Sequence, residues 1–209
     1  MKTRKVRYPK TNESLNSIIK GINPNPEDKI LAILGSGDQA IALAKSSKYI
    51  DAIDNDSNQI EYAKDRINLL KEKKFEEFLR GYKGKYPCNF FSEIKKWELN
   101  LENLNIIEGD IFKLNWNIYN KMYLSNIINF PYQELDYLER MKRFKQKANE
   151  LRRGGLIYII TFEQDIKEIL SEQKNINSIK INKKLTSDAK DYMKEFNEEG
   201  WNPLVFQKV

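Results

Sequence analysis

Short apolar runs alternate with longer amphipathic stretches along this chain. The apolar runs have the length and the β-branched, aromatic-rich composition of buried strands. In the amphipathic stretches apolar residues recur every three or four positions, which predicts helices with one buried face. The predicted strands are residues 30–34, 49–53, 104–107, 120–128, 156–162, 176–185 and 201–209. The predicted helices are residues 14–20, 39–44, 57–74, 75–82, 132–151, 165–172 and 187–197.

The alternation of predicted strands and helices indicates an α/β fold with a mostly parallel, seven-stranded sheet and helices on both faces. No internal repeat, linker or low-complexity block divides the sequence. We therefore expect a single domain over residues 1–209, with an N-terminal helical lead-in at 1–28 and an aromatic-rich insertion at 75–103. The aromatic side chains of this insertion form either a lid or buried core. They include Phe90, Phe91 and Trp97.

A glycine turn follows the first predicted strand. Its residues are Gly35, Ser36 and Gly37, and a helix begins directly after them. Glycines let a backbone approach a ligand with no side chain in the way. The second predicted strand ends at Asp54 and Asn55, and an acid at that point can accept both hydroxyls of a ribose. The spacing predicts an adenosine-containing cofactor.

The glycine turn alone leaves the identity of the cofactor open. Gly35, Gly37 and Ala40 match the dinucleotide fingerprint G-x-G-x-x-G/A, and Asp54 follows at the expected distance. The turn is therefore compatible with NAD and with S-adenosylmethionine. A glycine-rich turn between a strand and a helix also occurs in α/β domains for purely structural reasons.

Three downstream features favour S-adenosylmethionine. Asp110 follows the third predicted strand, where its carboxylate can accept the adenine amino group while Ile111 packs on the ring. Ser125 and Asn126 end the apolar part of the fourth predicted strand. A Leu-Arg-Arg-Gly-Gly turn precedes the fifth predicted strand. Together these motifs resemble the class I S-adenosylmethionine-dependent methyltransferase superfamily over residues 28–162. The resemblance implies a Rossmann-like methyltransferase domain. A dehydrogenase would need residues of a hydride-transfer site, and the sequence shows none.

A narrower resemblance concerns three short segments. Residues 54–60, 75–79 and 123–127 look like segments of the betaine-lipid synthase family, and residues 14–38 fit its lead-in. Those enzymes are S-adenosylmethionine:diacylglycerol 3-amino-3-carboxypropyl transferases. The resemblance implies the same fold and cofactor, with transfer of the aminocarboxypropyl group in place of the methyl group. Because this chain is much shorter than those enzymes, the resemblance bears less on the acceptor.

A further motif competes with the lipid interpretation. The sequence Asn-Phe-Pro-Tyr at residues 129–132 resembles the Asn-x-Pro-Tyr element of adenine-N6 methyltransferases that act on DNA or RNA. In that element the Asn accepts a hydrogen bond from the target amine and the Tyr stacks on the flipped base. The alternative is structural, since Pro131 favours the first turn of the following helix.

The predicted cofactor contacts divide along the ligand. Asp38 would hold the methionine amino group, Asp54 the ribose and Asp110 the adenine. Structural alternatives exist for two of them, because Asp38 can cap the helix and Asp110 can stabilise a turn. The predicted cofactor-binding residues are Gly35, Ser36, Gly37, Asp38, Asp54, Asn55, Asp110 and Ile111.

Transfer from a sulfonium is a direct displacement, so the protein must mainly align the donor with the acceptor, which contributes ~7 kcal/mol or more. Ser125 and Asn126 are expected where the sulfonium and the acceptor meet, unless they simply end the strand. Together with Tyr132 they form the predicted catalytic set. The candidates for a general base are Tyr123, Tyr132, Asp136 and Glu163.

Composition narrows the chemistry. The 209 residues include no histidine and a single cysteine, Cys88, which excludes His-dependent catalysis and an intrachain disulfide. We predict no metal site. The net charge of +6 and the pI near 9.1 fit an anionic partner such as nucleic acid or an acidic lipid surface. Acidic residues are nevertheless mixed with basic ones along most of the chain, as on ordinary solvated helix faces.

The sequence has neither a secretory signal nor an apolar run that approaches the ~20 residues of a membrane span, so we expect a cytoplasmic protein. Three functions stay open. They are transfer of an aminocarboxypropyl group to a small-molecule or lipid acceptor, transfer of a methyl group, including to nucleic acid, and binding of S-adenosylmethionine without catalysis. The sequence predicts neither the acceptor nor the oligomeric state.

Overall fold

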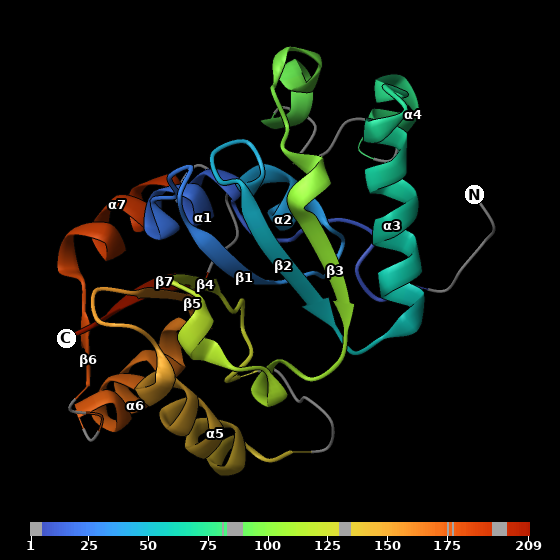
Figure 1. Ribbon diagram of the computed structural model, residues 1–209. Helices are drawn as coiled ribbons and strands as arrows, with labels where there is room; N and C mark the ends of the chain where they lie inside the picture. The colour runs from blue at the N-terminus through green and yellow to red at the C-terminus, as the bar shows by residue number, and fades with distance from the viewer. Residues whose placement is uncertain are drawn as a thin grey trace.

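The computed structural model describes residues 6–80, 82, 90–129, 135–174, 176, 178–193 and 200–209. Seven strands form one sheet in the order β3-β2-β1-β4-β5-β7-β6 (Figure 1). Neighbouring strands from β3 to β5 pair in parallel, and β7 runs antiparallel to both β5 and β6. The predicted fold class, a mostly parallel seven-stranded sheet, is confirmed. The strands are β1 Lys29–Ile33, β2 Tyr49–Asp54, β3 Leu104–Glu108, β4 Lys121–Tyr123, β5 Leu156–Phe162, β6 Ile179–Ile181 and β7 Trp201–Lys208.

Helices cover both faces of the sheet, as predicted. Residues of α1, α2, α3, α4 and α7 share one buried cluster with Ile30 and Ala32 of β1. The intervening Leu31 points to the other face, because side chains alternate along a strand, and there it packs with α5 and α6. The helices are α1 Leu15–Ile22, α2 Asp38–Leu43, α3 Ser57–Lys71, α4 Phe75–Arg80, α5 Tyr137–Glu150, α6 Glu163–Lys174 and α7 Lys183–Met193. The 3₁₀ turns are η1 Phe90–Lys96, η2 Leu101–Asn103, η3 Ile111–Lys113 and η4 Trp116–Ile118.

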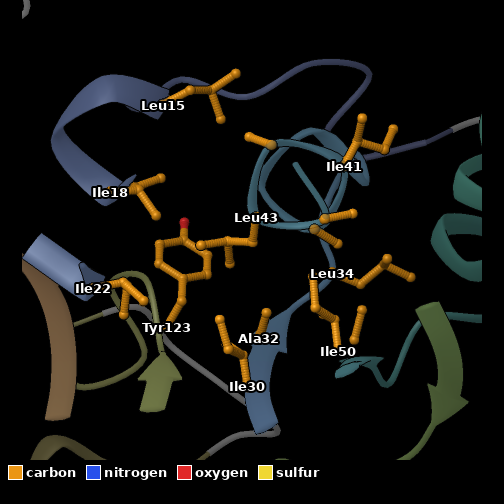
Figure 2. Packing of buried hydrophobic residues seen from close by; sticks show 14 of the residues in the cluster. Leu15, Ile18, Ile22, Ile30, Ala32, Leu34, Ile41, Leu43, Ile50 and Tyr123 are labelled. Carbon is orange, nitrogen blue, oxygen red and sulfur yellow. The ribbon is translucent and has the colours of Figure 1, made fainter. Parts of the chain in front are cut away.

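Helix α1 shows how local sequence and packing combine. Its N-terminus is capped by Ser14, whose hydroxyl accepts a hydrogen bond from Ser17 N at 3.2 Å. The predicted end at Gly21 is wrong, because the helix continues to Ile22. Gly21 lies inside the helix, where a Cβ atom would stand 2.4 Å from the ring of Tyr158. The glycine therefore serves close packing, and α1 sets Ile18 and its other apolar residues over the sheet (Figure 2).

The fourth strand is shorter than predicted. It ends at Tyr123, and Ser125 has a φ of 51°, which no regular strand accommodates. Ile127 donates its backbone N–H to Leu124 O at 3.2 Å, so the apolar residues that suggested a longer strand lie buried in a turn. This early end moves the polar residues that follow the strand to the edge of the sheet.

The predicted bounds of one strand and one helix in the C-terminal half of the chain need correction. Of the predicted strand at 176–185, only Ile179–Ile181 is a strand. It ends there because Asn182 accepts a hydrogen bond from Leu185 N at 3.0 Å and thereby starts α7. The predicted helix at 132–151 begins at Tyr137, where Asp136 accepts from Glu139 N at 2.8 Å as the N-cap. The first residues of that prediction, 132–134, lie outside the described residues.

The aromatic residues of 75–103 that the structure describes pack together. Phe91 is fully buried, and its ring centroid lies 5.3 Å from Phe78 and 5.7 Å from Tyr82. Phe90 and Trp97 pack against the same cluster. None of these rings lines the cavity described below. Cys88 lies outside the described residues.

Among the described residues, no helix combines the length and the apolar character that a bilayer crossing requires.

Candidate cofactor and acceptor site

A cavity of about 420 Å³ opens at the carboxyl ends of the parallel strands. It spans the point at which the strand order reverses, between β1 and β4, where ligands bind in open α/β sheets. The loops after β1, β2, β3 and β4 contribute to its wall, together with the end of β5, the start of β7 and residues near the N-terminus. The wall therefore draws on segments from the whole length of the sequence.

The glycine turn after β1 forms one part of the wall. Gly35 and Ser36 line the cavity, and Gly35 has a φ of 49°, a conformation that favours glycine. Gly37 does not line the cavity. Its φ is 87°, and a Cβ atom there would lie 3.3 Å from the Cβ of Ala63, so this glycine lets the turn approach α3. The two glycines thus have different tasks.

Asp54 lies at the cavity, at the end of β2, where the sequence predicts a ribose contact. Its carboxylate accepts hydrogen bonds from Gly35 N at 3.2 Å and from Asp56 N at 3.0 Å. Burial raises the pKa of the Asp54 carboxyl, and the two backbone donors oppose that shift. Asn55 lines the cavity as well. The carboxylate is therefore fixed in orientation and still faces the space where a sugar would bind.

The predicted adenine contacts lie after β3. Ile111 lines the cavity, whereas Asp110 is buried and does not line it. Asp110 Oδ1 accepts from Phe112 N at 2.9 Å, which is the predicted structural alternative of a turn-stabilising residue. Asp110 Oδ2 is 3.7 Å from Arg143 Nη1 and, among the described residues, is buried without a hydrogen-bond donor. The described contacts of Asp110 are therefore with the protein, as for a residue that stabilises a turn.

Asp38 does not line the cavity. It is fully buried and forms an ion pair with Arg66 at 2.8 Å. It also accepts hydrogen bonds from Thr11 N at 2.7 Å, from Ser36 Oγ at 2.8 Å and from the hydroxyl of Tyr82. These contacts give no support to the predicted contact with a methionine amino group. They fit a structural role, in which Asp38 joins the glycine turn to α3 and to the N-terminal segment.

That N-terminal segment, residues 6–13, is here called the strap. The backbone of Tyr8 both donates to and accepts from the side-chain amide of Gln59, at 3.1 and 2.7 Å. Gln59 Nε2 also donates to Gly35 O at 2.7 Å, so one amide links the strap to the glycine turn. The strap brings Arg7, Lys10 and four neighbouring residues into the cavity wall.

Glu13 is the functional candidate that the sequence did not reveal. The strap places this buried carboxylate at the cavity beside Ser125, whose hydroxyl donates to Glu13 Oε1 at 2.5 Å. Asn126 lines the cavity next to Ser125, as the sequence predicts for the acceptor region. Nothing in the local sequence marks Glu13, because the contact depends on the path of the strap.

The four predicted general bases differ in where they lie relative to the cavity. Tyr123 is fully buried outside the cavity wall, and desolvation followed by the nearby Glu13 carboxylate raises its pKa well above the ordinary value. Asp136 caps α5 and Glu163 begins α6, and neither lines the cavity. Tyr132 lies outside the described residues. Among the described candidates, the acid at the cavity beside Ser125 is therefore Glu13 rather than any of those predicted.

The β5 side of the cavity is built from aromatic and amide groups. Phe162 ends β5 and Trp201 begins β7, and both line the cavity. Asn129, the first residue of the Asn-Phe-Pro-Tyr motif, lines it too. Residues 130–132 of that motif lie outside the described residues. No sequence pattern marked the aromatic pair, because its two members are far apart in the chain.

Solved structures with the same architecture are numerous. An rRNA methylase from Streptococcus thermophilus aligns with a TM-score of 0.54 and 13% identity, over 92% of this chain and 94% of its own. The N-methyltransferase NodS from Bradyrhizobium japonicum, in complex with S-adenosylhomocysteine, aligns with a TM-score of 0.56 and 9% identity, over 93% of this chain and 85% of its own. This protein has the class I S-adenosylmethionine-dependent methyltransferase fold. The similarity in sequence is too low to extend beyond the fold.

Sequence comparison gives a shorter match. A segment of 72 residues is 36% identical to the "Probable ribosomal RNA small subunit methyltransferase A" of Thermococcus kodakarensis. The matched segment covers 34% of this chain and 23% of that relative. No protein-family model matches the chain. The comparisons lend no support to the narrower resemblance to betaine-lipid synthases.

Proposed function

We propose that this protein transfers a methyl group from S-adenosylmethionine to a nucleic-acid acceptor. The observation that carries the proposal is the position of Asp54, at the cavity on the carboxyl edge of the sheet, beside the glycine turn. The S-adenosylhomocysteine in NodS supports the same class of ligand for this fold. Ile111 lines the cavity on the β3 side, where an adenine ring would pack against it.

S-adenosylmethionine supplies an electrophilic carbon on a positively charged sulfur, so the chain's own residues need only bind, orient and accept a proton. Asp54 accepts the ribose hydroxyls, and its two backbone donors hold it in place. Gly35 keeps the wall free of a side chain where the ligand passes the turn. Ser125 and Asn126 orient the acceptor, and Glu13 is positioned to take a proton from an acceptor N–H or O–H.

A nucleic-acid acceptor is favoured by charge and by the sequence match. The net charge is +6, and Arg7 and Lys10 line the cavity itself. Basic side chains attract phosphate groups, and the same wall also carries the acids Glu13, Asp54 and Asp56. The relative from Thermococcus kodakarensis carries a ribosomal RNA methyltransferase name, which supports the same acceptor class.

A lipid acceptor is less well supported. The large apolar side chains exposed among the described residues are scattered over several elements, and Phe162 is the one that lines the cavity. A diacylglycerol would need a continuous apolar surface beside the transfer site. No observation favours aminocarboxypropyl transfer over methyl transfer, and the product of the reaction separates the two.

The test is incubation of the purified protein with S-adenosylmethionine and separate RNA, DNA and lipid acceptors. Mass spectrometry then identifies the nucleoside product. S-adenosylhomocysteine together with a methylated nucleic acid supports the proposal. Methylthioadenosine would mean that the aminocarboxypropyl group leaves, and would overturn it. Cofactor binding by calorimetry with no product from any acceptor would indicate a non-catalytic binding protein.

A further inference from the structure

Two glutamines hold the strap. Gln59 uses both ends of its amide, because Nε2 donates to Tyr8 O at 2.7 Å and Oε1 accepts from Tyr8 N at 3.1 Å. Gln39, in the first turn of α2, donates through Nε2 to Thr11 Oγ1 at 3.0 Å and to the hydroxyl of Tyr123 at 3.3 Å. Among the described residues, Gln39 Oε1 is buried without a hydrogen-bond donor. Buried polar atoms are nearly always paired, so this oxygen is open to a donor from a ligand.

The neighbouring hydroxyls determine which end of the Gln39 amide faces them. Thr11 Oγ1 donates to Glu13 O at 3.4 Å. Burial, and after it the Glu13 carboxylate, raises the pKa of the Tyr123 hydroxyl, as expected for a hydroxyl that donates to Glu13. Each hydroxyl has a single proton, so both accept from Gln39. The amide nitrogen therefore points to the hydroxyls and Oε1 points away from them.

The open oxygen lies beside the glycine turn. Gln39 is part of the cavity wall, and its Oε1 lies 4.0 Å from the point where a Cβ atom at Gly35 would stand. The carbonyl oxygens of Leu34, Gly35 and Ser36 already accept hydrogen bonds within the protein. Asp38 lies outside the cavity wall. Among the described acceptors of the turn, Gln39 Oε1 is therefore the one left for a ligand.

The hydrogen-bond donors of S-adenosylmethionine are its ribose hydroxyls, its adenine amino group and the ammonium group of its methionine part. In the proposed function Asp54, at the end of β2, accepts the ribose hydroxyls, and the adenine packs on the β3 side. Strand β1 lies between β2 and β4 in the sheet. An acceptor that follows β1 therefore meets the methionine part, which runs from the ribose toward Ser125. The donor that remains for Gln39 Oε1 is the ammonium group.

We propose that Gln39 couples the bound methyl donor to the strap: Oε1 accepts a hydrogen bond from the ammonium group of S-adenosylmethionine, while Nε2 holds Thr11. The inference rests on the proposed function, because it places that donor in the cavity. One planar amide carries both bonds, so a ligand that fixes the amide also strengthens its hold on the strap. By linkage, the strap should be held more firmly by a ligand with an ammonium group than by one without it.

The first test compares S-adenosylhomocysteine with its deaminated counterpart, in which hydrogen replaces the amino group. In calorimetry the wild-type protein should bind S-adenosylhomocysteine roughly tenfold more tightly, because the counterpart lacks a hydrogen bond from a charged group. Gln39→Met keeps the length of the side chain and loses the amide oxygen, so it should bind both ligands equally. Its unchanged affinity for the deaminated ligand would show that the variant is folded. Gln39→Glu keeps an acceptor and should keep the preference.

The second test measures the strap itself, as the rate of tryptic cleavage after Lys10, followed by mass spectrometry at saturating ligand. In the wild-type protein S-adenosylhomocysteine should slow this cleavage more than the deaminated ligand does. In Gln39→Met the two ligands should have the same effect. Gln59→Met is the matched control, because it loosens the strap at Tyr8 and leaves Gln39 in place. Its cleavage should be faster throughout, and the difference between the ligands should remain.

Four outcomes would overturn the inference. They are equal wild-type affinity for the two ligands, equal cleavage with both, loss of the preference in Gln39→Glu, and a preference that Gln39→Met retains. If Glu13→Gln then loses that preference, the ammonium group binds at Glu13.

Failure of the proposed function has a different signature. Ammonium-dependent binding and protection with no methylated product from any acceptor would sustain the role of Gln39 and overturn methyl transfer. Methylation of RNA by a protein that binds both ligands equally would sustain methyl transfer and overturn the role of Gln39. No binding of either ligand would overturn both.

Discussion

Ser125 donates a hydrogen bond to the carboxylate of Glu13, a residue 112 positions earlier in the chain. The contact joins the loop after β4 to the strap, and both residues line the cavity. Ser125 has a φ of 51°, so its hydroxyl is directed by an unusual backbone conformation. A carboxylate in this position can take up a proton in a chain that has no histidine.

Glu13→Gln tests that role. Glutamine has the same shape and still accepts from Ser125, but it cannot take up a proton. We expect methyl transfer in a single turnover to slow by ~100-fold, the usual contribution of a general base. Glu27→Gln is the control, because Glu27 is a surface residue whose ion pair with Lys48 spans 3.8 Å. An unchanged rate in Glu13→Gln would remove Glu13 from the mechanism.

Asp54→Asn tests the ribose contact. A carboxylate accepts from both ribose hydroxyls and from two backbone donors, and loss of one charged hydrogen bond costs about 1.5–3 kcal/mol. We expect S-adenosylmethionine to bind at least tenfold more weakly, as measured by calorimetry. Lys184 lies in a surface pair far along the chain, and Lys184→Ala should bind the cofactor normally.

The same residue gives a pH dependence with a defined sign. Burial raises the pKa of Asp54, so the folded protein holds this proton to a higher pH than the unfolded chain does. Protonation of Asp54 therefore stabilises the fold fully below the pKa that this carboxyl has in the unfolded chain. The stabilisation is lost as the pH rises through the pKa that it has in the folded protein. Cofactor affinity should change the opposite way, falling as pH falls through the folded pKa of Asp54. In Asp54→Asn this change of cofactor affinity with pH should disappear. Calorimetric titrations with S-adenosylmethionine at a series of pH values measure it.

The sheet and the positions of Gly35 and Asp54 were predictable from the sequence because they depend on local patterns. Gly35 and Asp54 are marked by their position after apolar strands, and both lie at the cavity. The residues at the other end of the cavity were only partly predictable. Ser125 and Asn126 follow a strand, but Glu13 and Trp201 reach the cavity through the course of the strap and the insertion of β7 between β5 and β6. No local periodicity encodes such long-range placement.

Gly21→Ala tests close packing between α1 and the sheet. Alanine favours helices, and in an open helix this change would stabilise by up to about 1 kcal/mol. Here the new Cβ atom would stand 2.4 Å from Cδ2 of Tyr158, so the ring or the helix must move. We expect a net loss of about 1–3 kcal/mol in the free energy of unfolding, measured by urea denaturation. Gly109→Ala should cost less, because its Cβ atom would meet Ile53 at an ordinary 3.8 Å.

Asp38→Ala tests the buried ion pair beneath the glycine turn. Removing the carboxylate leaves Arg66 buried without its partner at 2.8 Å, and loss of one member of a buried pair costs about 3–5 kcal/mol. The change also frees Thr11 N, so the strap should become more accessible to protease. Asp188→Ala breaks a surface pair with Lys184 and should shift the unfolding free energy by less than about 1 kcal/mol. A stable Asp38→Ala with lost cofactor binding would instead revive the ligand contact predicted from the sequence.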